Sequence, residues 1–351
     1  MHILGTLATD RFRLRAESRP HPGAHRRTHR PVLAAVAGVL VLWASPASAQ
    51  HVFESVGERA LGMGGAFVAV ADDATAVHWN PAGLVTGPAA GMTIGWGWFQ
   101  IGNQDTVPVP GPARRRGNLT SLGTWPLGLA YGRFETSRLV EGPGGETLAE
   151  TLQTSQYSAT ILQSVTTGLI VGSTLKYVRG HVAEALAEGG SARDALGIAA
   201  DLEGRRRGRF DLDLGVMANI APLRVGLTLK NLRTPSFGDL RTPENTLPRL
   251  ARLGVALLPS DGLTLAMDLD LNTVDLRDGL RRMFAVGGEG RVGRRLMVRA
   301  GGRLDLEGAR EPVGAVGLSV AFRVGVWLDA HYAQGQHDEQ REFGAALRAG
   351  F

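Results

Sequence analysis

Short segments in which apolar and polar residues alternate run through most of this chain. In residues 263–272 every odd-numbered residue is Leu or Met, and every even-numbered one is Thr, Ala, Asp or Asn. The same alternation recurs in residues 210–216, 223–230, 296–303 and 324–332. Side chains on a β-strand point alternately to opposite faces, so each segment predicts a strand with one apolar and one polar face. The chain is therefore expected to be all-β.

The last of these segments ends on an aromatic residue. Within residues 341–351, Phe343, Leu347 and Phe351 share one face with two alanines. Such an ending is typical of outer-membrane β-barrels, in which the last strand pairs with the first and its apolar face contacts lipid. We expect a transmembrane antiparallel β-barrel that closes at Phe351. Alternation alone also fits a soluble β-sandwich or propeller.

Fourteen strands are expected, and the connections between them alternate in length. Short turns follow long connections, as in barrels whose periplasmic turns are tight and whose external loops are long. This sorting favours the barrel over a soluble sandwich and places both termini at the periplasmic end. The long connection at residues 181–207 is expected to contain a short helix at residues 191–202. The expected strands are residues 92–101, 116–124, 127–136, 152–164, 167–180, 208–218, 223–231, 249–258, 262–272, 282–291, 294–304, 313–322, 324–333 and 341–351.

Aromatic residues are candidates for the membrane–water interface. They make up only 6% of the chain, which is few for the two girdles of such a barrel. We expect the interfacial side chains to be Trp96, Trp98, Trp125, Tyr332 and Phe343.

The basic character of the chain is confined to its first 49 residues. Seven of the 38 Lys and Arg residues and two of the 33 Asp and Glu residues lie there, so the remainder carries 31 of each. A nucleic-acid partner therefore loses its main support. Residues 1–49 are expected to be a signal peptide, with a basic region, an apolar run at residues 32–44 and small residues at 47–49. The absence of Cys excludes disulfides, thiolate metal sites and Cys nucleophiles.

If the apolar faces meet lipid, the charged residues on the opposite faces line the lumen. Both signs occur there, so ion pairs between strands are expected to hold the lumen together. The alternative is that some of these residues line a substrate path. The residues concerned are Asp211, Asp213, Arg224, Lys230, Arg252, Asp268, Asp270, Glu289, Arg291, Arg299, Arg303, Asp329, His331 and Arg348.

Catalytic and metal sites find little support in the sequence. Asp268 and Asp270 share one face and could bind a hard cation or act as an acid–base pair. His331 lies near Asp329 on one strand, an arrangement more often used in packing than in catalysis. The sequence shows no Ser/His/Asp constellation and no metal-ligand spacing. We therefore expect no enzymatic activity, no metal and no cofactor.

Residues 50–90 are expected to form a unit separate from the barrel at residues 91–351. Gly62, Gly64 and Gly65 could suggest a dinucleotide-binding loop. These glycines, however, precede an expected strand and do not join a strand to a helix, so nucleotide binding is disfavoured.

The remainder of this unit has a strand, a helix and a turn as its expected elements. The strand is residues 66–70, and Asp72 is expected to cap a helix that ends near Trp79. Pro81 and Gly83 then predict a turn. A unit of this size is too small to fold alone, but it could sit in the mouth of a barrel.

Two stretches of this unit resemble a known family. Residues 59–73 (Arg-Ala-Leu-Gly-Met-Gly-Gly-Ala-Phe-Val-Ala-Val-Ala-Asp-Asp) and residues 79–84 (Trp-Asn-Pro-Ala-Gly-Leu) resemble the opening of PorV/PorQ-type proteins of the FadL/TodX-like superfamily. The resemblance implies a fourteen-stranded barrel in the bacterial outer membrane, with the N-terminal segment plugging the lumen as a hatch. The matching motif residues are Arg59, Gly62, Gly64, Gly65, Phe67, Asp72, Asp73, Trp79, Asn80, Pro81 and Gly83.

The resemblance also implies the function. The first expectation is a FadL-like channel or carrier for hydrophobic small molecules, which bind at the hatch and leave sideways into the bilayer. The alternatives are a PorV-like component that docks secreted protein cargo in type IX-like secretion, with Arg205, Arg206 and Arg207 as candidate contacts, and a structural barrel with a closed lumen. The pocket candidates are Phe53, Leu61, Met63, Phe67 and Val70, for which simple packing is the alternative role.

The partners follow from the same expectations. Outer-membrane lipid and lipopolysaccharide would surround the barrel, and the barrel-assembly machinery would insert it. Hydrophobic small molecules or secreted protein cargo are the expected ligands, and no nucleic acid is expected.

Overall fold

The computed structural model describes the barrel and most of the segment before it. The expected signal peptide at residues 1–49 lies outside the described residues, as do Arg205 and residues 50–52. The described residues are 53, 56–102, 113–142, 144–187, 191–202, 204, 206–238, 245–276, 279–307, 312–336 and 340–351.

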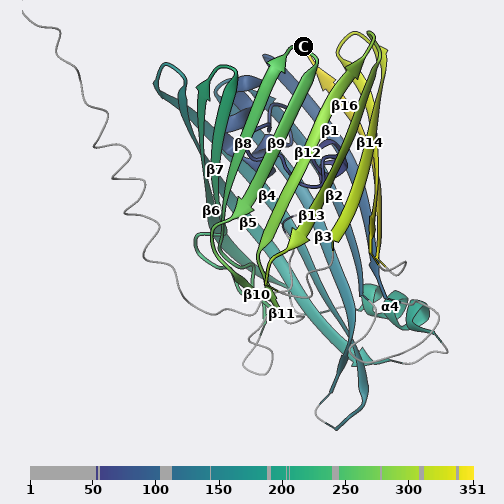
Figure 1. Cartoon of the computed structure of the whole chain (residues 1–351). Coiled ribbons are helices and arrows are strands. Elements are labelled where there is room, and N and C mark those ends of the chain that lie inside the picture. The colour runs from purple at the N-terminus through teal and green to yellow at the C-terminus, as the bar shows by residue number, and fades with distance from the viewer. Residues whose placement is uncertain are drawn as a thin grey trace, which may run out of the picture. The chain divides into compact units, whose positions relative to one another are not determined.

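Fourteen antiparallel strands close into one barrel (Figure 1). Each strand pairs with its neighbours along the chain, and no second sheet packs against the wall in the described residues apart from one small hairpin. The all-β prediction and the count of fourteen are confirmed, and the sandwich alternative is wrong. The barrel strands are β1 (Ala90–Ile101), β2 (Ala113–Thr124), β3 (Leu127–Glu141), β4 (Thr147–Thr166), β5 (Leu169–Leu186), β6 (Arg207–Ile220), β7 (Leu223–Lys230), β8 (Leu250–Ser260), β9 (Leu263–Asp270), β12 (Met283–Val292), β13 (Leu296–Asp305), β14 (Pro312–Arg323), β15 (Val326–Gly335) and β16 (Arg341–Gly350).

The first and last strands close the wall. β1 pairs with β16 in a register that sets Trp98 opposite Phe343, and these two rings stack with centroids 5.4 Å apart. Phe351 lies just beyond β16, where its backbone N–H donates to the Ala90 carbonyl at 2.8 Å. Closure by the last strand, predicted from its alternation, is confirmed.

The alternation sorts side chains between the outer wall and the lumen. Leu263, Leu265 and Met267 are exposed on the outside, whereas Asp268 and Asp270 on the other face are buried. A continuous apolar exterior suits lipid, because hydrocarbon cannot solvate polar groups. The five interfacial aromatics expected from the sequence are all exposed, at Trp96, Trp98, Trp125, Tyr332 and Phe343.

The long strands β3, β4 and β5 project beyond the rest of the wall at the end opposite the chain terminus (Figure 1). The sequence predicts that β3 ends at residue 136, that β4 begins at residue 152 and that β5 ends at residue 180, so all three predicted strands are too short at this end. Outside the wall, α4 (Ala192–Asp201) covers the extension, and its Leu196 is buried with Leu139 and Ala149. This packing stabilises strand structure where the alternation fades. The expected short helix at this point is confirmed.

The long-loop end also carries a small hairpin of β10 (Val274–Leu276) and β11 (Gly279–Arg281). The sequence predicts only a loop there. None of the described helices is long and apolar enough to cross a bilayer.

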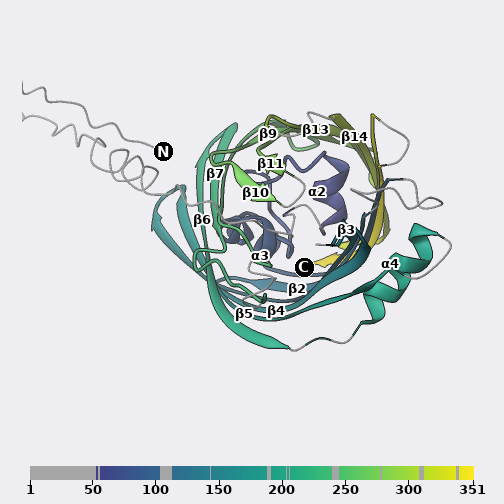
Figure 2. The ribbon, with the colours of Figure 1, turned by 90° about the horizontal axis from the view of Figure 1, so that it is seen from below.

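Residues 56–87 lie inside the ring of strands, and we call this segment the hatch (Figure 2). It consists of α2 (Glu58–Gly62), α3 (Ala76–Trp79) and the 3₁₀-helix η1 (Pro81–Thr86), joined by tight turns. The expected strand at residues 66–70 is wrong: the N–H groups of Val70 and Ala71 both donate to the Phe67 carbonyl. The wall strands pair with one another, so the hatch has no free edge to join.

The helix expected to begin at Asp72 is also wrong. α3 has a single turn, preceded by Thr75, whose N–H donates to Asp73 at 2.9 Å. Asp72 instead forms an ion pair with Arg59. The position of Asp72 is decided by its ion pair with Arg59, and the sequence rules for helix caps do not take such a distant charge into account.

Candidate functional site

Arg59 joins the hatch to the wall. Its guanidinium donates to both carboxylate oxygens of Glu289 on β12, at 2.8 and 2.7 Å, and also contacts Asp72 and Asp73 of the hatch. Glu289 accepts a further bond from Arg299 on β13. Two-pronged Arg–carboxylate contacts fix geometry as well as charge. The hatch is therefore held in one orientation by a buried network.

Asp268 provides a second anchor from β9. One of its carboxylate oxygens accepts the backbone N–H groups of Phe67 and Val68, each at 2.9 Å. Asp270 has a different role: it accepts from Arg252 and from the Met283 N–H. The two aspartates considered as a cation site or acid–base pair are thus engaged in separate structural contacts.

The lumen charges on β5, β6 and β7 form an ion-pair cluster. Lys176 lies 2.8 Å from Asp211 and 2.6 Å from Asp213, and Lys230 lies 2.8 Å from the second oxygen of Asp213. Lys230 also donates to the His78 carbonyl at 2.6 Å, which links the cluster to the hatch. Lys176 is absent from the residues selected by sequence, although its place on the polar face of its strand could have identified it.

The other predicted lumen charges lie on the strands from β7 to β16. Arg224 donates to Asn219 and to the Val70 carbonyl near the short-turn end. Asp329 pairs with Arg348, and Arg303 with Glu342. Arg291 lies on the same face of β12 as Glu289 and lines the lumen mouth at the short-turn end, as predicted, where its side chain is exposed.

The remaining motif residues shape the hatch. The Asn80 side chain donates to the carbonyls of Val68 and Val216 and accepts the Ala82 N–H. Trp79 is fully buried and donates its ring N–H to the Val56 carbonyl at 3.1 Å. A β-carbon at Gly83 would lie 1.9 Å from the Ala71 carbonyl oxygen. These residues therefore hold the hatch in its fold.

Glycines of the wall allow the hatch backbone to approach. Added β-carbons at Gly287 and Gly301 would lie 2.2 and 2.3 Å from backbone atoms of Met63. Gly64, with φ of +69°, similarly approaches Gly302. Gly62 and Gly65 lie in the same stretch, and Gly62 packs on Gly317. The hatch is seated where wall side chains are missing.

Four of the five pocket candidates are packed in the hatch core. Leu61, Met63, Phe67 and Val70 are at most 2% exposed and belong to one apolar cluster. In this structure these four side chains pack against one another, whereas Phe53 also lines a cavity.

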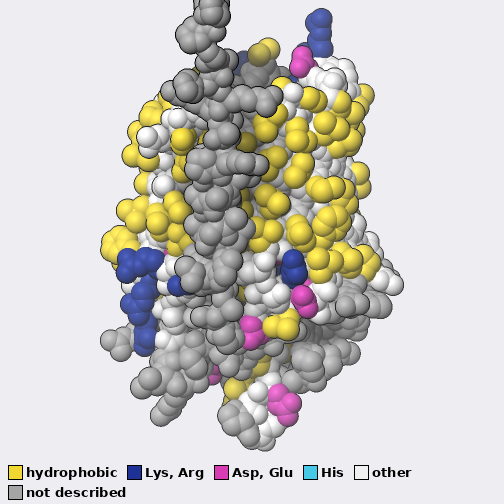
Figure 3. All heavy atoms as spheres, turned by 60° about the vertical axis from the view of Figure 1, so that its left-hand side comes forward, with side chains coloured by type: hydrophobic (Ala, Val, Ile, Leu, Met, Phe, Trp, Pro, Cys, Tyr) yellow, Lys and Arg dark blue, Asp and Glu magenta, His cyan; other side chains and the backbone are white. Residues whose placement is uncertain are grey.

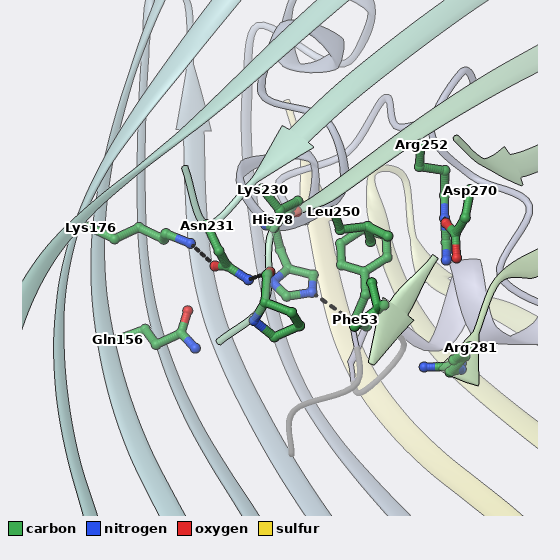
Figure 4. A pocket seen from close by; sticks show the side chains of 12 residues that line it. Phe53, His78, Gln156, Lys176, Lys230, Asn231, Leu250, Arg252, Asp270 and Arg281 are labelled. Atoms are coloured by element: carbon green, nitrogen blue, oxygen red, sulfur yellow. Dashed lines mark hydrogen bonds and ion pairs between the residues drawn. The ribbon is translucent and has the colours of Figure 1, made fainter. Parts of the chain in front are cut away.

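The Phe53 cavity is bordered by Lys230 and Leu250, at the long-loop ends of β7 and β8, and Figure 4 shows the side chains that line it. The Phe53 ring stacks on His78 at 5.2 Å and meets Trp79 edge-on at 4.6 Å. Leu250 of β8 and Val274 of β10 complete the apolar part. The polar lining comes from Gln156, Lys176, Lys230, Asn231, Arg252, Asp270 and Arg281.

This cavity is small in the described conformation. Its volume is about 40 Å³, whereas an engineered protein cavity that binds benzene has about 150 Å³. The cationic groups of Lys230 and Arg252 lie 5.3 and 4.8 Å from the Phe53 ring centre and occupy its ring face. A hydrophobic ligand can therefore bind only if the ring or the β10–β11 hairpin moves.

Glu58 is a buried acid on the hatch. It is 1% exposed, neither carboxylate oxygen has a hydrogen-bond partner in another described residue, and it lies against the bare backbone of Gly95. Burial raises the pKa of the Glu58 carboxyl well above its usual range, and the nearby Asp329 and Asp73 raise the pKa further. Burial therefore favours the protonated form of this carboxyl in the seated hatch.

We expect the Glu58→Gln variant to lose a pH dependence of stability. Because the folded pKa lies above the unfolded one, the wild-type barrel is most stable below the unfolded pKa and loses about 1.4 kcal/mol per pH unit above it, until the folded pKa is reached. Denaturant unfolding between pH 4 and pH 8 measures this slope. A variant slope equal to that of wild type would show that Glu58 is not the titrating group.

Comparisons with known proteins agree with the architecture. The monoaromatic hydrocarbon channel CymD has 16% identity and a TM-score of 0.63, covering 86% of this chain and 99% of that chain. The toluene transporter TbuX of Ralstonia pickettii has 15% identity and a TM-score of 0.63, with 85% and 99% covered. A FadL homologue of Pseudomonas aeruginosa has 11% identity and a TM-score of 0.58, with 85% and 98% covered. The fold is thus that of FadL/TodX-type barrels.

Sequence comparisons reach less far. A family model described as "F plasmid transfer operon, TraF, protein" matches residues 152–270, which is less than half of the chain. No curated protein matches the sequence.

Proposed function

We propose that this protein is an outer-membrane channel or carrier for hydrophobic small molecules. The observation that carries the proposal is the Phe53 cavity, an aromatic-lined space between the hatch and the long-loop end of a fourteen-stranded barrel. The proposal is supported by structures of the same fold that are described as a monoaromatic hydrocarbon channel and a toluene transporter.

In this mechanism the ligand approaches from the long-loop end. Transfer from water to the Phe53 cavity is driven by burial of apolar surface, worth about 0.8 kcal/mol per CH₂ group. The bound ligand displaces Phe53 from its stack on His78, which lies on α3 and so transmits the movement to the hatch.

Onward passage requires the hatch to shift. The ladder of β3 with β2 runs without a break along residues 127–138, and that of β3 with β4 along residues 127–141, so the described strands leave no side opening there. A vestibule of about 320 Å³ lies between the hatch and the short-turn end of the barrel. It is lined by Asp72, Trp327 and Arg348. Loosening the Arg59 network would connect the cavity to this vestibule, whereas a sideways exit would need strand hydrogen bonds to break.

A blocked cavity tests the proposal. We expect Leu250→Trp, which fills the Phe53 cavity, to abolish uptake of toluene into liposomes that contain the barrel. Leu265→Trp is the matched control, because Leu265 is on the lipid face and 47% exposed. Equal uptake by both variants, with both barrels showing a heat-dependent shift in gel mobility, would rule out transport through this cavity.

The proposal also covers the membrane in which the barrel lies and the PorV/PorQ-type family to which it belongs. Residues 59–73 and 79–84 support a PorV/PorQ-type barrel in the outer membrane, with the short turns toward the periplasm, lipopolysaccharide around the long-loop half and insertion by the barrel-assembly machinery. Cargo docking is not favoured, because Arg207, one of its candidate contacts, donates to the Gly238 carbonyl in the segment after β7.

A further inference from the structure

The outer wall over β3 to β6 carries a row of four aromatic rings. Tyr131, Tyr157, Tyr177 and Phe210 are successive cross-strand partners. Their ring centroids are 5.1, 6.5 and 5.1 Å apart, and all four side chains point outward and are exposed. Rings with a polar tip prefer the level of lipid headgroups, so this aromatic row marks an interface.

An apolar groove lies on the short-turn side of the aromatic row. It has a volume of about 480 Å³ and is lined by Leu122, Leu129, Ala159 and Leu175 together with the rings. These four residues also line a second outer hollow of about 700 Å³, which continues toward the short-turn end through Leu127 and Ile161. The two hollows together form a long apolar track down the wall.

Arginines lie on the other side of the aromatic row. Arg133 follows Tyr131 by two residues on β3, and Arg179 follows Tyr177 by two residues on β5, so both point outward at the long-loop side of the rings. Each pairs across the ladder with Ser155, which separates the two arginines by two strand spacings, about 10 Å. In the part of the chain that the structure describes, neither arginine has an ion pair.

Further charges surround these two arginines. Arg116 is exposed on β2 and lies opposite Glu135 of β3, an acidic residue near the two arginines. The Glu135 carboxylate accepts the Gln153 side-chain N–H at 3.1 Å. Figure 3 shows hydrophobic side chains over the wall and Lys and Arg side chains gathered at its left edge, toward the long-loop end.

We propose that this face binds one molecule of a phosphorylated glycolipid of the outer leaflet, the lipid A part of lipopolysaccharide. From the long-loop end inward, β3 and β5 present Arg, Tyr and Leu, the order of phosphate, headgroup interface and acyl chain in such a lipid. Guanidinium groups bind phosphate in a two-pronged manner, and two arginines about 10 Å apart suit two phosphates on one headgroup. The inference rests on the proposed membrane orientation and is independent of the transported ligand.

Native mass spectrometry of the detergent-solubilised barrel tests this site with three probes: bis-phosphorylated lipid A, monophosphoryl lipid A and phosphatidylethanolamine. We expect wild type to retain one bis-phosphorylated lipid A and to bind the other two more weakly. The double variant Arg133→Ala/Arg179→Ala should weaken lipid A binding by about tenfold or more. The matched control is Arg294→Ala/Arg295→Ala, two exposed arginines at a short turn.

Two results would overturn the inference. One is equal lipid A affinity in the double variant and its control; the other is wild-type binding of phosphatidylethanolamine as tightly as lipid A, which would make the face a general lipid contact. If the double variant does not insert into the membrane, the single variants Arg133→Gln and Arg179→Gln are measured instead. Lipid A affinity equal to that of the control would again overturn the inference. Leu250→Trp should keep full lipid A binding, so failure of the transport proposal is distinguished from failure of this site.

Discussion

The Arg59→Ala variant is expected to lose about 3–5 kcal/mol of unfolding free energy and to conduct ions. Arg59 is the shared partner of Glu289, Asp72 and Asp73, and both Glu289 and Asp73 are at most 5% exposed. Removing the guanidinium leaves Asp72 and Asp73 without this counter-charge and facing Glu289, which keeps only Arg299, and removing one partner of a buried ion pair is strongly destabilising. Denaturant unfolding in lipid measures the loss, and conductance across a planar bilayer reports a displaced hatch.

A double-mutant cycle separates this effect from general damage. Glu289→Gln removes the charge of the opposing carboxylate, so the Arg59→Ala/Glu289→Gln protein should lose less stability than the sum of the two single variants. Arg294→Ala, at an exposed short turn, should leave both measurements unchanged. If Arg59→Ala behaved like Arg294→Ala, the hatch would be held by other contacts.

Gly287→Val is expected to unseat the hatch by steric conflict. A β-carbon at this position would lie 2.2 Å from the carbonyl oxygen of Met63 and 2.8 Å from its carbonyl carbon. These are backbone atoms, which cannot rotate away as a side chain can, so the hatch itself must move. The expected loss is about 3 kcal/mol, at the upper end of the usual range for overpacking. Protease cleavage within residues 56–87 detects the released segment.

Gly314→Val provides the matched control for this experiment. Gly314 is also a strand glycine, but a β-carbon there meets no atom within 4 Å. This variant should keep the hatch protected and the barrel heat-modifiable. Comparable cleavage in both variants would mean that valine perturbs strands in general and that the close approach of hatch and wall is unimportant.

The strands could be predicted because their signal is local. One face of β9 contacts lipid and the other contacts the polar lumen, so its residues must alternate between apolar and polar. The pattern at residues 263–270 therefore predicts both the strand and which of its side chains face outward. The signal fades where strands leave the wall, as in β3 beyond residue 136. There the contact with α4 decides the strand end.

The hatch could not be predicted in the same way. Its turns are stabilised by groups far away in the sequence, such as Asp268 for the N–H groups of Phe67 and Val68. A run such as residues 66–70, rich in Ala and Val, has the local preference of a strand, and that preference is overridden where no strand edge is free. The resemblance of residues 59–73 to a known family indicated that a hatch exists, without giving its conformation.

Residue type likewise cannot distinguish a pocket from a packed core. Phe53 and Phe67 are both apolar neighbours of Trp79, yet Phe67 is fully enclosed and only Phe53 borders a cavity. Arg59 of the hatch covers the Phe67 ring and Asp268 accepts the Phe67 N–H, whereas Lys230 and Arg252 of the wall lie over the Phe53 ring beside the cavity.

The class of fold, the number of strands, the face on which each charge lies and the closure of the last strand on the first can all be predicted from local patterns, because a period of two acts over a few residues. The conformation of the hatch, the need for glycine at Gly287 and Gly301, the carboxylates that pair with Arg59 and the position of the cavity follow only from the packed structure. These features depend on contacts between segments more than 200 residues apart, such as Arg59 with Glu289, and no local pattern encodes such contacts.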